Sequence, residues 1–194
     1  MEKSVKRIVL LASGSGSNVE NINTHFKENT GVSISCVLTN RKNAGVLDRC
    51  LRLGIPAIHF NKIAFKDTDT VLRFLRSLEP DLVVLAGFLW KIPEDIIAAF
   101  PNKIINIHPA LLPKYGGKGM YGHHVHEAVK ANNEKESGIT IHYVNKNYDE
   151  GAIIHQAKTT ILKTDTVERI AEKIHGLEFE HFPKVIEKLV FKNG

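Results

Sequence analysis

The stretch Arg7–Asn18, which reads RIVLLASGSGSN, holds the main indication of the fold. Its apolar run Ile8–Ala12 predicts a buried strand. The segment Ser13–Ser17, made only of glycine and serine, predicts a sharp turn, and residues 18–28 predict a helix. A strand, a glycine-rich turn and a helix in this order are typical of a Rossmann-like βαβ unit.

The rest of the chain continues this alternation of apolar runs and amphipathic segments. Strands are expected at 7–12, 32–39, 56–60, 82–86, 104–107, 138–144 and 152–160, and helices at 18–28, 45–53, 67–78, 93–100, 123–131 and 166–189. The run Leu82–Ala86 is apolar on both faces, as a central strand covered by helices should be. Pro183 is expected to kink or split the last helix. The expected fold is a single domain, 1-194, of the α/β class, doubly wound, with a mostly parallel sheet and a Rossmann-like N-terminal half.

Composition excludes a disordered tail, a collagen-like fibre and a low-complexity array. The 194 residues are 43% hydrophobic and 24% charged, which is ordinary for a globular protein. The net charge of +5 suits an anionic small substrate, and the absence of a dense Lys/Arg block disfavours nucleic acid as a partner. Cys36 and Cys50 are too few for a disulfide framework and are expected to be buried thiols. We expect a cytoplasmic protein without a membrane partner, and either a monomer or a homodimer.

The segment Ser13–Asn18 is a candidate anion site. Glycines let the backbone approach a ligand closely, and the N–H groups at a helix start attract negative charge. The third glycine of the dinucleotide fingerprint is replaced by Val19, and no Gly-Lys-Ser/Thr of a Walker loop follows. The hydroxyls of Ser15 and Ser17 favour one phosphate over a pyrophosphate. A plain tight turn with a serine cap is the alternative.

Asn106 and His108 are two residues apart on a predicted strand, so both side chains should point to the same face. Histidine can transfer a proton near neutral pH, and the asparagine amide can donate to a developing oxyanion. A structural histidine and a loop-capping asparagine are the alternative. Asp149 is a turn residue on any interpretation, and near His108 it would raise the pKa of the imidazole.

Three histidines, His123, His124 and His126, invite a metal interpretation. No Cys or Asp beside them supplies an evident third ligand, so exposed or loop-packing histidines are expected and no metal is expected. Phe88 and Trp90 could stack on a flat ligand or cover the end of the sheet.

Four motifs together carry a resemblance to a known family. They are Ser-Gly-x-Gly-Ser-Asn at 13–18, Val-Leu-Ala-Gly-Phe at 84–88, Asn-Ile-His-Pro-x-Leu-Leu-Pro at 106–113 and Asp-x-Gly at 149–151. In this order they closely resemble the phosphoribosylglycinamide formyltransferases (GAR transformylases) of the folate-dependent formyltransferase superfamily. The resemblance covers almost the whole chain.

The resemblance implies transfer of a formyl group from 10-formyltetrahydrofolate to the amine of 5-phosphoribosylglycinamide (GAR) in de novo purine biosynthesis, without a metal. The implied catalytic residues are Asn106, His108 and Asp149. The implied contacts to the phosphate and ribose of GAR are Gly16, Ser17, Asn18, His175 and Glu178. The implied folate contacts are Leu89, Trp90, Lys91, Ile92, Asn106, Asn145, Lys146, Asn147, Tyr148 and Asp149.

The chain departs from the family pattern in places, and other functions remain to be weighed. His175 stands where the family often has a lysine, and Trp90-Lys91 stands where a version with arginine is common. A methionyl-tRNA formyltransferase would need a further RNA-binding domain, and a formyltetrahydrofolate deformylase an extra N-terminal domain; neither is expected here. A non-enzymatic phosphate- or nucleotide-binding module is the remaining alternative.

Overall fold

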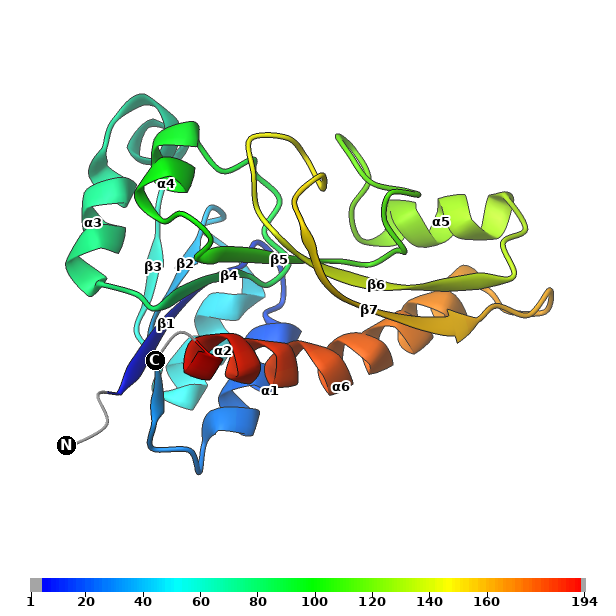
Figure 1. Cartoon of the computed structure of the whole chain (residues 1–194), viewed down its shortest axis with the longest axis horizontal. Helices are drawn as coiled ribbons and strands as arrows, with labels where there is room; N and C mark the ends of the chain where they lie inside the picture. The colour runs from blue at the N-terminus through cyan, green and yellow to red at the C-terminus, as the bar shows by residue number, and fades with distance from the viewer. Residues whose placement is uncertain (1–4, 193–194) are drawn as a thin grey trace.

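The computed structural model describes residues 5–192, so the extreme ends of the expected 1-194 domain lie outside the described residues. A seven-stranded sheet in the order β3-β2-β1-β4-β5-β6-β7 forms its centre (Figure 1). The strands are β1 (Lys6–Leu11), β2 (Val32–Thr39), β3 (Ala57–His59), β4 (Leu82–Leu85), β5 (Ile104–His108), β6 (Glu136–Tyr143) and β7 (Ile153–Thr160). Strands β1 to β5 are parallel, whereas β6 is antiparallel to β5 and to β7. The expected mostly parallel α/β sheet is confirmed.

Helices cover both faces of the sheet, which confirms the doubly wound arrangement. They are α1 (Ser17–Phe26), α2 (Gly45–Leu53), the short π-helix η1 (Ile63–Asp67), α3 (Thr70–Leu78), α4 (Glu94–Ala99), α5 (His123–Ala131) and α6 (Val167–Lys192). Side chains alternate along a strand. Ile8 and Leu10 of β1 therefore pack into a core with α1, α2, α5 and α6, whereas Val9 and Leu11 pack into a second core with α3 and α4.

The strand order reverses at β1, which pairs with β2 on one side and with β4 on the other. In open α/β sheets the connections on the two sides of such a point leave in opposite directions and open a crevice at the carboxyl ends of the strands. The segments that follow β1, β4 and β5 begin at this crevice. These segments contain the motifs that the sequence predicts to be functional.

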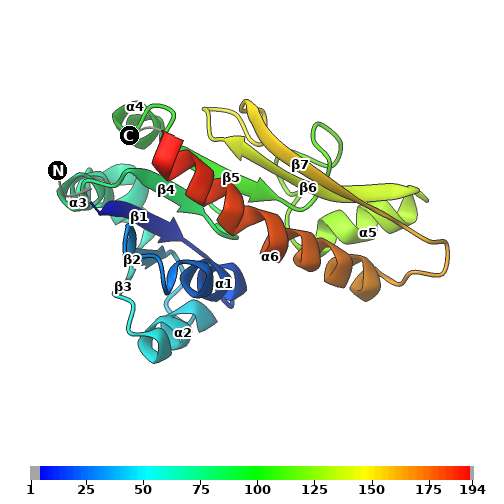
Figure 2. The same ribbon diagram turned by 60° about the horizontal axis from the view of Figure 1, so that its bottom comes forward.

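Pro183 lies inside the last helix without interrupting it. Helix α6 continues from Val167 to Lys192 (Figure 2), so the expected split is wrong. Proline lacks the N–H that would bond the carbonyl four residues earlier, which is that of Phe179. The side-chain amide of Asn21, on α1, donates to this carbonyl over 3.0 Å. A hydrogen bond from a neighbouring helix thus replaces the missing helical one.

The segment before α3 also differs from the expected helix at 67–78. Helix α3 begins only at Thr70, and the preceding residues form the π-helix η1 around the buried Phe65. Thr68 between the two helices is extended. Burial of Phe65 against the second core therefore shapes this segment more than its helical propensity does.

Cys36 and Cys50 are buried free thiols, as expected, and burial raises the pKa of Cys36 to about 11. Among residues 5–192, no helix combines the length and the apolar character that crossing a membrane requires.

Candidate functional site

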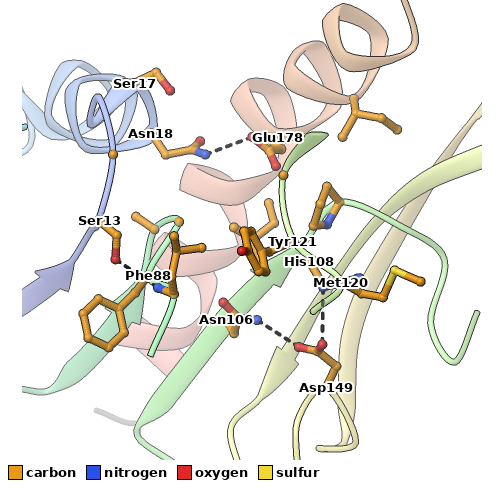
Figure 3. Close-up of a pocket in the computed structure, with 18 of the residues that line it drawn as sticks. Ser13, Ser17, Asn18, Phe88, Asn106, His108, Met120, Tyr121, Asp149 and Glu178 are labelled. Atoms are coloured by element: carbon orange, nitrogen blue, oxygen red, sulfur yellow. Dashed lines mark hydrogen bonds and ion pairs between the residues drawn. The ribbon is translucent and has the colours of Figure 1, made fainter. Parts of the chain in front are cut away.

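A cavity of about 580 Å³ opens at the carboxyl ends of β1, β4 and β5 (Figure 3). We call it the larger cavity. Its wall combines segments that are far apart in the sequence: 13–18 after β1, 86–89 after β4, 106–109 at the end of β5, 117–122 of the glycine-rich loop, and residues of α6. The cavity lies where the doubly wound fold predicts a ligand.

Asn106 and His108 project from β5 toward a common partner, Asp149, which lies between β6 and β7 (Figure 3). Asn106 Nδ2 donates to Asp149 Oδ1 over 3.5 Å, and His108 Nδ1 lies 3.6 Å from Asp149 Oδ2. The side chains of His108 and Asp149 are only 4% and 11% exposed. The structure therefore brings together the three residues predicted to be catalytic.

The Asp149 carboxylate is set up to remain ionised. Burial raises the pKa of this carboxyl, but the rings of His142 and His108 and the N–H of Gly117 lower it more, so the net shift is downward. The Gly117 N–H donates to Asp149 Oδ2 over 2.9 Å. A charged acceptor thus faces the His108 ring at neutral pH.

The His108 imidazole itself departs from the expectation. Its Nε2 donates to the carbonyl oxygen of Tyr115 over 2.7 Å, so in the neutral ring Nδ1 carries the lone pair. Burial lowers the pKa of His108, and the opposing effects of Asp149 and the Tyr115 carbonyl do not overcome it. The predicted rise in pKa is therefore wrong in its net direction, although the carboxylate acts in the expected sense.

His142 on β6 belongs to the same cluster and is not among the residues predicted from the sequence. It stands opposite Asn106 in the antiparallel register of β5 and β6. Its Nε2 accepts from Asn106 Nδ2 over 3.2 Å, and its Nδ1 donates to the carbonyl of Tyr143 over 2.9 Å. A histidine within the apolar run 138–144 is a visible signal, but only the register of the strands reveals its partner.

Gly16, Ser17 and Asn18, predicted to bind a phosphate, lie where α1 begins, at the opposite end of the larger cavity from Asp149 (Figure 3). Gly16 has a φ of 76°, and a Cβ added there would lie 2.4 Å from Val46 Cγ2. Only glycine fits this turn. The first turn of an α-helix leaves N–H groups without helical partners, so it favours an anion.

Glu178 and His175 on α6 face the start of α1. Asn18 Nδ2 donates to Glu178 Oε2 over 2.9 Å, and His175 Nδ1 lies 3.2 Å from the same oxygen. The hydrogen bond to Glu178 raises the pKa of His175, and partial burial opposes it without reversing the shift. The predicted partners Asn18, His175 and Glu178 therefore meet, from opposite ends of the chain.

Two buried polar atoms at this end lack a hydrogen-bond partner among the described residues: Asn18 Oδ1 and His126 Nδ1. His126 is 5% exposed and lines the larger cavity from α5, which differs from the expected exposed or loop-packing histidine. Burial lowers the pKa of His126. Its neighbours His123 and His124 are exposed, as expected, and approach Glu127.

Metal ligands are not gathered in the part of the chain that the structure describes. Within residues 5–192, no group of three or more His, Cys, Asp or Glu side chains is arranged to hold a metal ion.

A smaller cavity of about 70 Å³ lies beside the larger one. It is lined by most of the residues predicted to contact folate: Leu89, Trp90, Lys91, Ile92, Asn106, Asn145, Asn147, Tyr148 and Asp149. The exception is Lys146, which is exposed and lines neither cavity. The Lys91 ammonium lies 5.9 Å from the centre of the Tyr148 ring, so these two side chains meet at the rim.

Trp90 joins an aromatic cluster behind the smaller cavity. Its ring centre lies 6.1 Å from that of Phe60 and 5.8 Å from that of Phe65. Phe88 packs against both phenylalanines. These rings support the wall formed by 88–92, and η1 contributes through Phe65.

A comparison with protein-family models finds a match to the formyl transferase family over residues 6–186. This match covers all of the residues that form the sheet and line both cavities. It includes Asn106, His108 and Asp149.

Individual relatives carry a more specific description. The chain is 36% identical to the chloroplastic phosphoribosylglycinamide formyltransferase of Arabidopsis thaliana over 93% of this chain, but it spans only 64% of that relative's length. It is 37% identical to the phosphoribosylglycinamide formyltransferase of Bacillus subtilis over 98% of this chain and 97% of that protein. The crystal structure of the phosphoribosylglycinamide formyltransferase of Anaplasma phagocytophilum superposes with a TM-score of 0.88 at 34% identity, covering 97% of this chain and 89% of the other.

Proposed function

The chain belongs to the formyl transferase family, and we propose that it transfers the formyl group of 10-formyltetrahydrofolate to the amine of GAR in de novo purine biosynthesis. One observation carries this proposal: Asn106 and Asp149 line both cavities, so the formyl-transfer centre (Asn106, His108 and Asp149) lies at their junction. Transfer between two bound molecules requires the reacting atoms to meet at such a place.

The larger cavity suits GAR. The start of α1 offers N–H groups to the phosphate, and His175 can add a positive charge because Glu178 raises its pKa. The Glu178 carboxylate and the unpartnered Asn18 Oδ1 are acceptors for hydroxyl groups of the ribose. The glycinamide amine can then extend toward Asn106.

The smaller cavity suits the pterin of the folate. Its apolar walls, which include Phe88, Ile92 and Val144, match a flat heteroaromatic ring, and the amides of Asn145 and Asn147 can pair with polar ring atoms. Folate enters here as a co-substrate that supplies the formyl group. The proposal leaves Lys146 outside the pterin pocket.

The chemistry needs positioning and charge stabilisation. The amine nitrogen of GAR attacks the formyl carbon, the bond from that carbon to the folate nitrogen breaks, and a proton passes from the amine to the folate nitrogen. Asn106 Nδ2 and protonated His108 would stabilise the oxyanion that forms in between. Asp149 would hold the charge of the imidazolium and relay protons through water. The amine is itself the nucleophile, so the reaction requires no metal and no covalent enzyme intermediate.

The lowered pKa of His108 is compatible with this role. Burial favours the neutral ring, while Asp149 and the Tyr115 carbonyl favour the charged one. An oxyanion forming beside the ring adds a further negative charge and raises the pKa during the reaction. His108 can therefore become a proton donor when the intermediate forms.

The decisive experiment measures release of tetrahydrofolate from 10-formyltetrahydrofolate, with and without GAR. We expect release that depends on GAR and that falls about 100-fold or more in His108→Ala and Asp149→Asn. As a matched control, His124→Ala changes an exposed histidine outside both cavities and should retain the activity. Release without GAR would indicate a deformylase. A folded protein that binds folate or phosphate but releases nothing would indicate a binding module.

Domain organisation, location and assembly form part of the same proposal. A single seven-stranded sheet supplies both cavities, which supports one formyltransferase domain over 1-194. The buried free thiols support a cytoplasmic enzyme, although the Arabidopsis relative is described as chloroplastic. Small molecules are the expected partners, and both a monomer and a homodimer remain compatible with the site.

A further inference from the structure

The segment 115–117 of the glycine-rich loop contacts both ionisable groups of the formyl-transfer centre. The carbonyl of Tyr115 accepts from His108 Nε2 over 2.7 Å, and the N–H of Gly117 donates to Asp149 Oδ2 over 2.9 Å. The first bond determines which nitrogen of the His108 ring carries the proton. The second orients the carboxylate that faces the other nitrogen. A three-residue stretch of backbone thus aligns the imidazole and the carboxylate together.

This stretch has a backbone conformation that needs support from elsewhere. Tyr115 has a φ of 57°, in the left-handed region that bulky residues seldom adopt. Gly116 is tightly enclosed, since a Cβ there would lie 2.6 Å from Leu112 Cδ2 and 3.3 Å from Asp149 Cβ. A residue in such a conformation persists only where its surroundings hold it.

The surroundings that hold Tyr115 include Glu134, in the turn between α5 and β6. The Tyr115 hydroxyl donates to Glu134 Oε1 over 3.0 Å, and the Lys114 ammonium donates to the same oxygen over 2.9 Å. Hydrogen bonds from Lys114 and Tyr115 lower the pKa of the Glu134 carboxyl, so it stays ionised. Glu134 lines neither the larger nor the smaller cavity.

We infer that Glu134 is a positioning residue for formyl transfer: its bond to the Tyr115 hydroxyl holds the Tyr115 carbonyl on His108 and the Gly117 N–H on Asp149. Glu134 touches no substrate. Its kinetic effect depends on the proposed function, whereas its effect on the His108 ring does not.

The inference has a signature that a purely structural role lacks. The charged and titratable groups that act on the pKa of His108 are Asp149, His142 and Glu178, and the Tyr115 carbonyl acts on it through a hydrogen bond. The Tyr115 carbonyl favours the charged ring. A variant that weakens the hydrogen bond between this carbonyl and His108 should therefore lower the pKa of His108 further. If His108 acts as a proton donor, the alkaline limb of the rate profile then moves to lower pH.

The kinetic test compares Tyr115→Phe, which removes only the hydroxyl, with Glu134→Ala, Glu134→Gln and the double variant Tyr115→Phe/Glu134→Ala. We expect kcat to fall about fivefold to tenfold in Tyr115→Phe and in Glu134→Ala, as for the loss of one aligning hydrogen bond. KM for GAR should stay within about twofold. Glu134→Gln keeps an acceptor oxygen and should stay within about twofold of the original protein. The double variant should lose little more than either single one, because both changes break the same bond.

Glu136→Gln is the matched control. Glu136 lies two residues further along and pairs with exposed Lys158, away from the loop. This variant should keep kcat, KM and the pH profile. If Tyr115→Phe also keeps them, the inference is wrong. It is equally wrong if Glu134→Ala lowers activity only in proportion to unfolded protein, with an unmoved pH profile.

A second measurement does not depend on catalysis. NMR titration of the imidazole nitrogens, with His108 assigned from its loss in His108→Ala, should give a lower pKa for His108 in Tyr115→Phe and Glu134→Ala than in the original protein and in Glu136→Gln. If formyl transfer itself is absent, the proposed function fails, but this titration still decides the inference. An unchanged His108 pKa and tautomer in both variants would overturn it.

Discussion

The larger cavity contains two histidine–carboxylate pairs whose similar geometry has opposite consequences. In the proposed formyl-transfer centre, His108 Nδ1 lies 3.6 Å from Asp149 Oδ2, and burial lowers the pKa of the histidine. Where α1 begins, His175 Nδ1 lies 3.2 Å from Glu178 Oε2, and this contact raises the pKa of the histidine. Two differences accompany this contrast. His175 is hydrogen-bonded to its carboxylate, whereas His108 lies too far from Asp149 for a hydrogen bond, and the side chain of His108 is 4% exposed whereas that of His175 is 54% exposed.

The comparison shows that a neighbouring carboxylate does not by itself determine the charge of a histidine. Removal from water opposes the imidazolium, and the opposition grows with burial. The buried pair can therefore change its protonation when a charge develops beside it. The half-exposed pair instead keeps a positive charge available to an anion over a wider range of pH.

The largest effect is expected from Asp149→Asn, which breaks the buried pair. The amide cannot balance an imidazolium, so the pKa of His108 should fall further and kcat should fall about 100-fold. Glu178→Gln provides the comparison, because it alters the other pair and should act mainly on KM for GAR. Steady-state kinetics on both variants decides the point, and equal losses of kcat would contradict the division of roles.

A smaller effect is expected from His175→Ala, which removes the cation of the exposed pair. KM for GAR should rise about tenfold with little change in kcat, as for the loss of one charge-assisted hydrogen bond. In the original protein KM should also rise with pH, because His175 loses its proton as the pH rises through its raised pKa.

The variant His175→Lys sharpens the same prediction. Lysine keeps its charge as the pH rises through the pKa of His175, so the rise of KM with pH should flatten. His124→Lys is the control, since it changes an exposed histidine that faces Glu127 and should retain the original pH dependence. A KM that rises equally steeply in His175→Lys would exclude His175 as the source.

Asn21→Ala should affect the His175–Glu178 pair and leave the His108–Asp149 pair almost unchanged, because it alters the support of α6. The change removes the donor to the Phe179 carbonyl within α6, which carries His175 and Glu178, whereas His108 lies on β5. We expect a loss of about 1 kcal/mol in unfolding free energy, or about 2–4 °C in Tm, and a higher KM for GAR with kcat nearly unchanged. In a Pro183→Ala background the helix regains its own N–H donor, and Asn21→Ala should cost less. Equal costs in both backgrounds would contradict this explanation of the unbroken helix.

The smallest effect is expected in the pH dependence of stability, where the two histidines should act in opposite directions. The folded pKa of His108 lies below the unfolded value of about 6.5, so its contribution is present above that value and is lost as the pH falls from there through the folded pKa. The folded pKa of His175 lies above it, so its contribution is present at low pH and is lost as the pH rises through the folded pKa.

Tm measured against pH tests these signs. His108→Gln should lose less stability in acid than the original protein, with buried His126 still contributing to the remaining loss. His175→Gln should flatten the curve on the alkaline side. Matching curves for both variants would refute the contrast between the pairs.

The sequence predicts most of the fold because the deciding signals are local. The apolar run Leu82–Ala86 and the turn Ser13–Ser17 each identify their element without knowledge of the rest of the chain. The errors arise where a distant residue intervenes. Asn21 satisfies the carbonyl that Pro183 leaves free, and burial of Phe65 shapes η1.

The site is predictable to a similar extent. Spacing on a strand places Asn106 and His108 together, and the motif order that carries the resemblance adds Asp149. The pairing of His142 with Asn106 depends on strand register, which no local pattern encodes. The net pKa of His108 depends on burial by many segments at once and is likewise invisible in the sequence.

The wall shared by the two cavities also matters for protein engineering. The pocket proposed for GAR alone draws on 13–18 and α6, whereas the pocket proposed for folate alone draws on 90–92, Val144, Asn145 and Asn147. The two cavities share Phe88, Leu89, Asn106, Tyr148 and Asp149. To accept a different formyl acceptor, the start of α1 and one face of α6 could therefore be redesigned. The pocket proposed for folate and the residues Asn106, His108 and Asp149 would stay unchanged.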